Sequence, residues 1–440
     1  MFASSLKAGK KMESRGRLPG MAPSLKSQTP PAARAERHSC LPPPPAPCCV
    51  FSRQWVGPLI GVPEPNPAHR FRVHGRREAR MVRDSSRYAV IMAGGWGDRF
   101  WPLSRPSRPK PVLRIGDRER SFLEEILECA RRVVPREGLL IATGASVARA
   151  IRSVGIDLPS DGYIVEPAKR DTAGCVVFVL ASLLARGAAD DAVVGFLTSD
   201  NVIGGVEGFQ QGLEAAYLAA GSDDRLVCLG IRPSRPDTAF GYIEVADGAG
   251  HAEPGSVVSV GRFTEKPDAE TARQLAASGR HFWNSGMLIG RIGIFLAEMA
   301  RHAPELHRAV HSIREAMAGG DADRVAEVFQ ALEPVSIDYA LLEKADLGMV
   351  VADFAWETLN GWDALDRLLT PDEAGNVVVG DPLLIDASDS VVYVDPAAAG
   401  KSVAVVGASG LVVVVTDDAV LVVPKDRAQE VKAAVRALRQ

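Results

Sequence analysis

The sequence has few cysteines, and their scarcity excludes classes of protein. Six cysteines occur in 440 residues. Three of them, Cys129, Cys175 and Cys228, are isolated, without the close pair that is typical of a zinc site. We expect them to be small core residues of a protein in the reducing cytoplasm. We assign no role to the eight histidines.

Long apolar runs are also missing. No uninterrupted run approaches the roughly 18 to 20 residues of a membrane helix, and the N-terminus lacks the apolar region and cleavage site of a secretory signal. We therefore expect a soluble, non-exported protein without a membrane partner. The net charge is −3; residues 1–80 carry an excess of about 10 positive charges and the remainder about 13 negative charges. This acidic body argues against nucleic-acid binding.

Residues 1–84 differ in composition from the rest of the chain. They contain roughly 13 of the prolines, including PPPPAP at 42–47, and show neither helical nor strand periodicity. Such a segment cannot bury enough apolar surface to offset its ordering entropy. Three interpretations are open: a disordered tail, an Arg-rich organellar transit peptide, or upstream sequence included by an incorrect start, with Met81 as the true one. We favour a tail or an incorrect start.

Beyond residue 84 the pattern predicts an α/β domain over 85–370. Short apolar strands alternate with helical patterns: strands at 88–93, 138–144, 163–167 and 192–200, helices at 121–133, 146–153 and 173–186. This alternation is typical of a Rossmann-like, mostly parallel sheet covered on both faces, with ligands at the carboxyl ends of the strands. Residues 371–440 hold short Val-rich strands and a closing helix, which indicates a small β-rich domain. Its many strand edges favour a homodimer.

The stretch GGWGDRFWPLSRPSRPKP follows the first strand and predicts an anion site. Gly94, Gly95 and Gly97 allow consecutive amide groups to converge on a phosphate. The loop lacks the GxGxxG spacing of dinucleotide folds and continues instead into Arg99 and Lys110. Glycine amides together with two cations suit a triphosphate. The alternative is a glycine turn with two solvated cations.

Other polar segments also follow apolar strands. Asp200 ends the strand VVGFLTSD, where its carboxylate could hold Mg²⁺ together with phosphate oxygens; alone it would more often be a turn or cap residue. EPAKRDTAG at 166–174 offers Arg170 and Asp171, FTEKP offers an acid and a base, and FWNSGM offers an amide beside a glycine.

These segments resemble the motifs of mannose-1-phosphate guanylyltransferases, within the sugar-nucleotide pyrophosphorylases. GGWGDRFWPLSRPSRPKP, EPAKRDTAG, TSDNVI, RPDTAFGYIEV, FTEKP, FWNSGML, SIDYALLEK and NGWDAL occur in the family's order. The resemblance spans about residues 86–439. It implies a GT-A-like nucleotidyltransferase domain, a β-helix-like C-terminal unit, and the joining of GTP and mannose 1-phosphate to give GDP-mannose and pyrophosphate.

The resemblance also implies roles for individual residues. Gly94, Gly95, Gly97 and Arg99 would bind the triphosphate, Lys110 would neutralise the reacting phosphate, and Asp200 would bind Mg²⁺. Glu265 and Asn284 would bond sugar hydroxyls, Lys266 would pair with the sugar phosphate, and Glu166, Arg170, Asp171 and Gly241 are further substrate- or nucleotide-binding candidates. Asp171 could accept the two adjacent donors of guanine.

The sequence departs from the family's pattern at four places. Asp98 stands where threonine or a similar residue is usual, PKPVL replaces PKQFL, and Asn201 replaces a common histidine. Thr358 occupies the position of a second metal-binding aspartate, and Glu357 lies one residue earlier, on the opposite face of an extended segment. Asp98 or Glu357 could supply the missing carboxylate. Two alternatives to the guanylyltransferase follow: a catalytically weak regulatory homologue that binds nucleotide sugar, or a pyrophosphorylase for another nucleotide and sugar.

Overall fold

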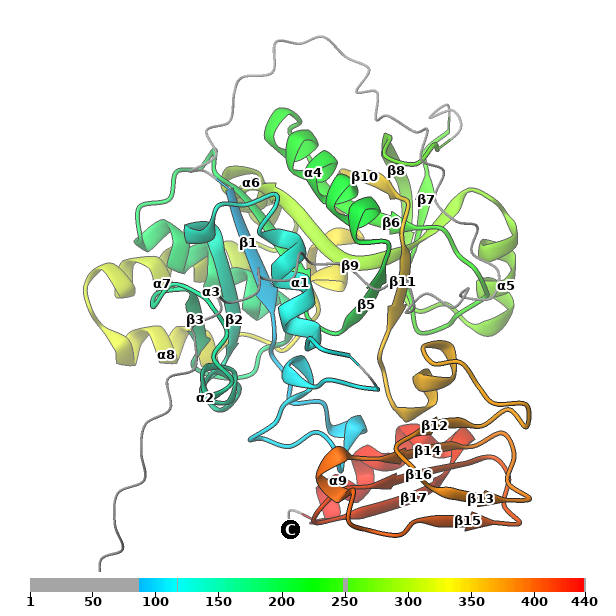
Figure 1. The fold of residues 1–440 in the computed structure, drawn as a ribbon. Helices are drawn as coiled ribbons and strands as arrows, with labels where there is room; N and C mark the ends of the chain where they lie inside the picture. The colour runs from blue at the N-terminus through cyan, green and yellow to red at the C-terminus, as the bar shows by residue number, and fades with distance from the viewer. Residues whose placement is uncertain (1–86, 117, 248–251, 439–440) are drawn as a thin grey trace, which may run out of the picture. The chain divides into compact units, whose positions relative to one another are not determined.

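A computed structural model describes residues 87–116, 118–247 and 252–438 (Figure 1). The predicted extension 1–84 lies outside the described residues. The main sheet has nine strands in the order β3-β2-β1-β4-β9-β6-β10-β8-β7. Their bounds are β1 Arg87–Met92, β2 Leu139–Gly144, β3 Tyr163–Glu166, β4 Val193–Thr198, β6 Leu226–Ile231, β7 Tyr242–Val245, β8 Val257–Thr264, β9 His281–Arg291 and β10 Leu347–Ala352.

The sheet is parallel in its first part and mixed beyond it. Strands β3, β2, β1 and β4 are parallel neighbours, as the alternating pattern predicts, and so are β6 and β10. Strand β9 runs antiparallel to both β4 and β6, and β7 and β8 pair antiparallel with each other. Because β1, β2 and β4 are covered on both faces, they consist almost entirely of apolar residues.

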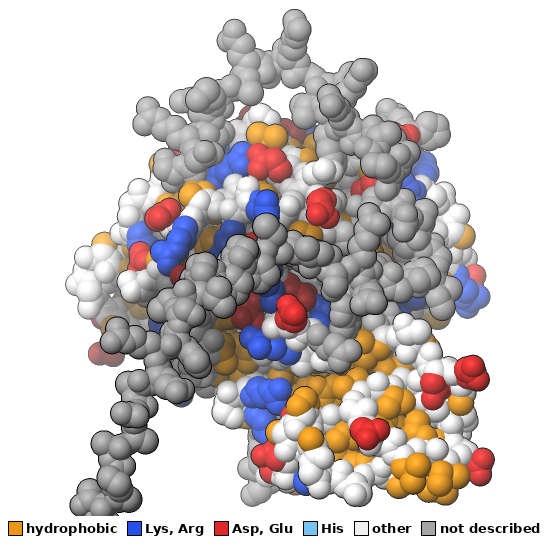
Figure 2. Space-filling model, in the orientation of Figure 1, with side chains coloured by type: hydrophobic (Ala, Val, Ile, Leu, Met, Phe, Trp, Pro, Cys, Tyr) orange, Lys and Arg blue, Asp and Glu red, His pale blue; other side chains and the backbone are white. Residues whose placement is uncertain are grey.

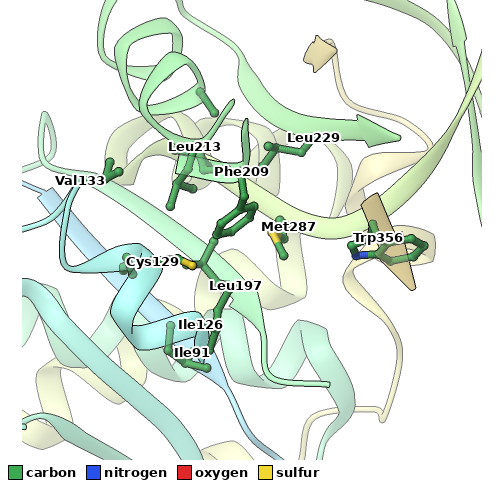
Figure 3. Close-up of a cluster of buried hydrophobic side chains, with 14 of the residues drawn as sticks. Ile91, Ile126, Cys129, Val133, Leu197, Phe209, Leu213, Leu229, Met287 and Trp356 are labelled. Atoms are coloured by element: carbon green, nitrogen blue, oxygen red, sulfur yellow. The ribbon is translucent and has the colours of Figure 1, made fainter. Parts of the chain in front are cut away.

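Helices cover the two faces of the sheet over separate cores. The helices are α1 Phe122–Ala130, α2 Ala145–Ser153, α3 Asp171–Ala185, α4 Val206–Ser222, α5 Ala269–Ala277, α6 Ile292–His302, α7 Pro304–Ala318 and α8 Ala322–Gln330. Ala89 and Ile91 of β1 pack into one core and Val90 into the other, since successive strand side chains alternate. Figure 3 shows part of the first core, where Phe209 of α4 lies near Cys129 of α1.

The structure bears on the expectations for the cysteines and for membrane helices. Cys129, Cys175 and Cys228 are buried and unpaired with each other, which confirms their prediction as small core residues. Among the helices of the described residues, none is both long and apolar enough to cross a membrane.

The C-terminal residues form stacked coils of short strands. Strands β12 (Val377–Val379), β14 (Val391–Val394) and β16 (Leu411–Val415) are parallel neighbours, with β17 (Val420–Pro424) antiparallel at the edge. A second sheet pairs β13 (Leu383–Ile385) with β15 (Ala404–Val406), again in parallel. Parallel pairing between successive short repeats confirms a β-helix-like unit, and α9 (Val431–Leu438) ends it as predicted.

This unit shares a core with the segment that follows the glycine loop. Phe100, Leu103 and Leu113 belong to the same buried cluster as Tyr393 and Val412. The indole of Trp362 donates a hydrogen bond to the carbonyl oxygen of Trp101 at 2.9 Å. Arg108 and Asp395 form an ion pair across the same contact, also at 2.9 Å. The glycine loop is therefore supported from both parts of the chain.

Candidate active site

The glycine loop leaves β1 and returns to the protein at Lys110. Gly94 and Gly95 are exposed, and Gly97 has a φ of 82°. A Cβ atom at Gly97 would lie 2.5 Å from Cβ of Lys110, so the close approach of these two residues requires glycine. The backbone amide of Lys110 donates to the carbonyl oxygen of Trp96 at 2.9 Å. The loop and Lys110 thus form one packed element.

Lys110 is buried and points to Asp200. Its ammonium donates to Oδ2 of Asp200 at 3.1 Å and also to the carbonyl oxygen of Leu359. Asp200 follows β4 and the glycine loop follows β1, and these strands are parallel neighbours, so both reach the same edge of the sheet. The structure therefore brings together two residues that lie 90 positions apart.

Arg99 and Asp98 begin a short 3-10 helix, Asp98–Phe100, directly after Gly97. Arg99 is exposed and Asp98 is half-buried. Within the described part of the chain, neither side chain has a hydrogen-bond or ion-pair partner. Both charged groups are consequently available to a ligand at the loop.

A small two-stranded sheet lies beside Asp200 and holds two of the departures from the family's pattern. Strand β5 (Asn201–Gly204) pairs antiparallel with β11 (Ala355–Thr358), and Asn201 lies opposite Thr358. The hydroxyl of Thr358 donates to Oδ1 of Asn201 at 2.9 Å. The two departures thus contact each other and form a neutral pair next to Asp200.

Glu357, the neighbour of Thr358, is paired with two arginines. It is buried, and its carboxylate accepts hydrogen bonds from Arg235 at 2.9 Å and from Arg367 at 3.1 Å. Alternation along β11 directs its side chain to the face opposite Thr358. Two arginines thus bond the oxygens of Glu357 in this structure, and its role as a metal ligand stays a prediction.

At this edge of the sheet, Asp200 is the carboxylate that could hold Mg²⁺. Among the described residues, no three His, Cys, Asp or Glu side chains are grouped so that they could hold a metal ion. Asp200 itself is partly exposed, with 42% of its side chain accessible, and Lys110 contacts only one of its oxygens. Mg²⁺ is commonly held by one or two carboxylates plus substrate phosphates. Asp200 with phosphate oxygens meets that minimum.

A second cluster gathers Gly241, Glu265, Lys266 and Asn284. Lys266 has a φ of 43° and forms an ion pair with Glu265. A Cβ atom at Gly241 would overlap Oε2 of Glu265, so this glycine leaves room for the carboxylate. The backbone amide of Asn284 donates to the carbonyl oxygen of Gly241 at 2.8 Å. These four predicted residues come from β9, from the start of β7 and from the turn after β8.

Asp338 belongs to this cluster, although no role was predicted for it. Its Oδ1 accepts a hydrogen bond from Nδ2 of Asn284 at 2.9 Å. Burial, and next the negative charge of Glu265, raise the pKa of Asp338 to about 6. The only sequence signal was its place in the motif SIDYALLEK.

Glu166, Arg170 and Asp171 lie at the end of β3 and the start of α3. Arg170 donates to the carbonyl oxygen of Gln330 at 3.1 Å, which ties this turn to the end of α8. Asp171 has a φ of 58° and accepts from the amide of Thr172 at 2.8 Å. Burial raises the pKa of Glu166 to about 7. In the described structure no hydrogen bond or ion pair joins these residues to Lys110, Asp200 or the Glu265 cluster.

Comparisons with known proteins agree with this geometry. A family model described as nucleotidyl transferase matches residues 88–333, and a model described as the MannoseP isomerase/GMP-like beta-helix domain matches residues 380–438. A mannose-1-phosphate guanylyltransferase of Klebsiella pneumoniae is 35% identical over 361 residues, which cover 80% of this chain and 74% of that protein.

Further relatives extend the agreement. Mannose-1-phosphate guanylyltransferase ManC of Salmonella typhimurium is 33% identical over 372 residues, covering 82% of this chain and 74% of that protein. A crystal structure from Thermus thermophilus, named mannose-1-phosphate geranyltransferase, is 34% identical, covers 81% of this chain and 100% of that one, and superposes with a TM-score of 0.70. The chain therefore belongs to the nucleotidyl transferase family, among the mannose-1-phosphate guanylyltransferases.

Proposed function

We propose that this chain joins GTP and α-D-mannose 1-phosphate to give GDP-mannose and pyrophosphate. An oxygen of the sugar phosphate attacks the α-phosphorus of GTP, and the bond from that phosphorus to the β-phosphate oxygen breaks on the opposite side, so that pyrophosphate leaves. The attacking oxygen is already ionised near neutral pH. The reaction therefore needs no protein nucleophile, and positioning and charge compensation are the main contributions of the enzyme.

The observation that carries this proposal is the contact of Lys110 with Asp200 beside the glycine loop, at 3.1 Å. In the proposal, the amides of Gly94, Gly95 and Gly97 and the guanidinium of Arg99 bind the triphosphate. Lys110 leaves Asp200 for the phosphate oxygens and compensates their charge during attack. Mg²⁺, when bound by Asp200 and phosphate oxygens, supplies further charge neutralisation at the α-phosphorus.

The second cluster supplies the sugar-phosphate subsite in this proposal. Lys266 pairs with the phosphate of the sugar, while Glu265 and Asn284 bond its hydroxyls. Asp171 is proposed to lie near the base. Its Oδ1 accepts from the amide of Thr172, its other carboxylate oxygen is not used in that bond, and the carboxylate accepts the N1–H and N2–H donors of guanine. Asp171→Ala should then lower the preference for GTP over ATP, and an unchanged ratio of kcat/KM values would remove this role.

The assembly and compartment follow as parts of the same proposal. Figure 2 shows apolar side chains, in orange, spread over the C-terminal strands. Leu383, Val406, Val420 and Val422 of these strands are exposed. A second copy that covers these strands would form a homodimer. Because GTP is a cytoplasmic substrate, we place the reaction in the cytoplasm.

The neutral pair of Asn201 and Thr358 favours a second candidate function. With a single carboxylate beside Lys110, the chain could bind nucleotide sugar and turn it over poorly, as a regulatory homologue. Pyrophosphate release from the purified full chain, measured with four nucleoside triphosphates and a panel of sugar 1-phosphates, with and without Mg²⁺, separates the candidates. We expect the highest rate with GTP and mannose 1-phosphate, and Lys110→Met as the control should abolish it.

Two other outcomes would redirect the assignment. Release with another nucleotide and sugar would assign a different pyrophosphorylase. No release in any combination, together with calorimetric binding of GDP-mannose, would establish the regulatory homologue.

A further inference from the structure

Asp338 fixes the orientation of the Asn284 side-chain amide. Nδ2 of Asn284 donates to Oδ1 of Asp338 at 2.9 Å, and Oδ1 of Asn284 accepts from the backbone amide of Gly286 at 3.1 Å. If the amide were flipped, its NH2 group would face the N–H of Gly286 and its oxygen would face the carboxylate of Asp338. Neither contact would be a hydrogen bond, so only one orientation satisfies both neighbours. The amide of Asn284 is thus held at both ends.

The bonds that remain on this amide define what it can bind. A primary amide has two N–H donors and two carbonyl lone pairs, and Asp338 and Gly286 use one of each. One donor and one acceptor are left, side by side on the same planar group. Two adjacent hydroxyl groups, one accepting and one donating, match that pair. Neighbouring hydroxyl groups of a hexose offer this pattern, whereas an ionised phosphate offers acceptors only.

Asp338 lies among the charged groups of the same cluster. Glu265, from the turn after β8, raises the pKa of Asp338, and its neighbour Lys266 lowers it. The charge of Asp338 in turn raises the pKa of Cys228 on β6. It is also the first residue of a π-helical turn, Asp338–Leu342, whose Leu341 and Leu342 are buried. The turn anchors Asp338 by packing, while its carboxylate faces the predicted sugar subsite.

We propose that Asp338 is a positioning residue for the sugar phosphate, which acts by holding the amide of Asn284 ready for two neighbouring hydroxyls of the hexose. The inference rests on the proposed function, because it takes the cluster of Glu265, Lys266 and Asn284 to be the sugar subsite. It assigns to Asp338 an effect on sugar binding that leaves nucleotide binding intact.

The test compares Asp338→Ala with Asp338→Asn in the full chain. Alanine removes the acceptor, and the loss of a hydrogen bond to a charged group should raise the KM for mannose 1-phosphate by roughly tenfold or more. The KM for GTP should change less than about twofold. Asparagine keeps a carbonyl oxygen for Asn284 and should restore most of the affinity.

Controls keep the outcomes separate. Asp323→Ala, an exposed change on α8, should leave both KM values as in wild type. Thermal unfolding checks that Asp338→Ala is folded, and calorimetric titration with GDP-mannose measures binding without turnover. If wild type binds GDP-mannose and Asp338→Ala binds it equally well, or if Asp338→Asn fails as badly as alanine, the positioning role is wrong while the proposed function stands. If wild type neither binds GDP-mannose nor releases pyrophosphate, both are overturned.

Discussion

Gly97→Ala tests whether the glycine loop positions Lys110. Gly97 has a φ of 82°, and a new Cβ atom would lie 2.5 Å from Cβ of Lys110. The left-handed conformation costs an L-residue roughly 1–2 kcal/mol, and overpacking against the fixed stem of Lys110 adds about 1–3 kcal/mol. We expect a loss of about 2–5 kcal/mol in the free energy of unfolding, measured by urea denaturation at constant m-value.

The same substitution should impair catalysis. To restore ordinary contact, the stem of Lys110 must move by roughly 1 Å, and a displacement of that size at a positioned group can cost on the order of 100-fold in rate. Gly155→Ala is the matched control, because Gly155 has a φ of 74° with no atom within 4 Å of its new Cβ. It should lose only about 1–2 kcal/mol and no activity. Equal destabilisation by both variants, or a folded Gly97→Ala with kcat/KM within about threefold of wild type, would refute the reasoning.

Three further predictions concern buried or replaced carboxylates. Burial raises the pKa of Glu166 from 4.5 to about 7, so the folded chain holds a proton that the unfolded chain releases, and stability falls as the pH rises from about 4.5 to about 7. Glu166→Gln should therefore be more stable than wild type at pH 8, by on the order of 1–3 kcal/mol, and similar to it at pH 4; urea midpoints at the two pH values check this. Glu357→Gln leaves two partly exposed arginines without their anion and should lower the free energy of unfolding by about 1–3 kcal/mol, with an unchanged Mg²⁺ dependence of pyrophosphate release. Thr358→Asp places a second carboxylate beside Asp200 and should tighten Mn²⁺ binding in the absence of nucleotide about tenfold, measured by electron paramagnetic resonance; unchanged binding would show that the position does not face the metal.

The alternation of strands and helices from β1 to β4 and the loop with Lys110 and Asp200 could be predicted from the sequence. The apolar strands and their polar carboxyl ends are local patterns, and parallel neighbours bring those ends to one edge. The pairing of Glu357 with Arg235 could not be predicted, because 122 positions separate the two residues and the choice of partner depends on the tertiary fold. The same holds for Asn284 and Asp338, which are 54 positions apart.

Helix α4 was not predicted, and its glycines explain why. Residues 206–222 contain glycine at 208, 212 and 221, which lowers the local helix propensity. In the structure, a Cβ atom at Gly208 would overlap the carbonyl oxygen of Asp353, and Gly212 packs against Leu229. Close approach to neighbouring segments, and the burial of Phe209 and Leu213, therefore stabilise a helix that local preference disfavours.

The core shared by the glycine loop and the C-terminal unit makes their folding cooperative. Phe100 and Leu103 follow the loop directly, and they are buried with Tyr393 and Val412 of the β-helix-like coils. Local opening of those coils would remove the support of the loop, and a nucleotide that binds only the ordered loop would oppose that opening. Amide hydrogen exchange in β14 and β16 should therefore slow when GTP binds, although these strands are not among the residues proposed to touch the nucleotide.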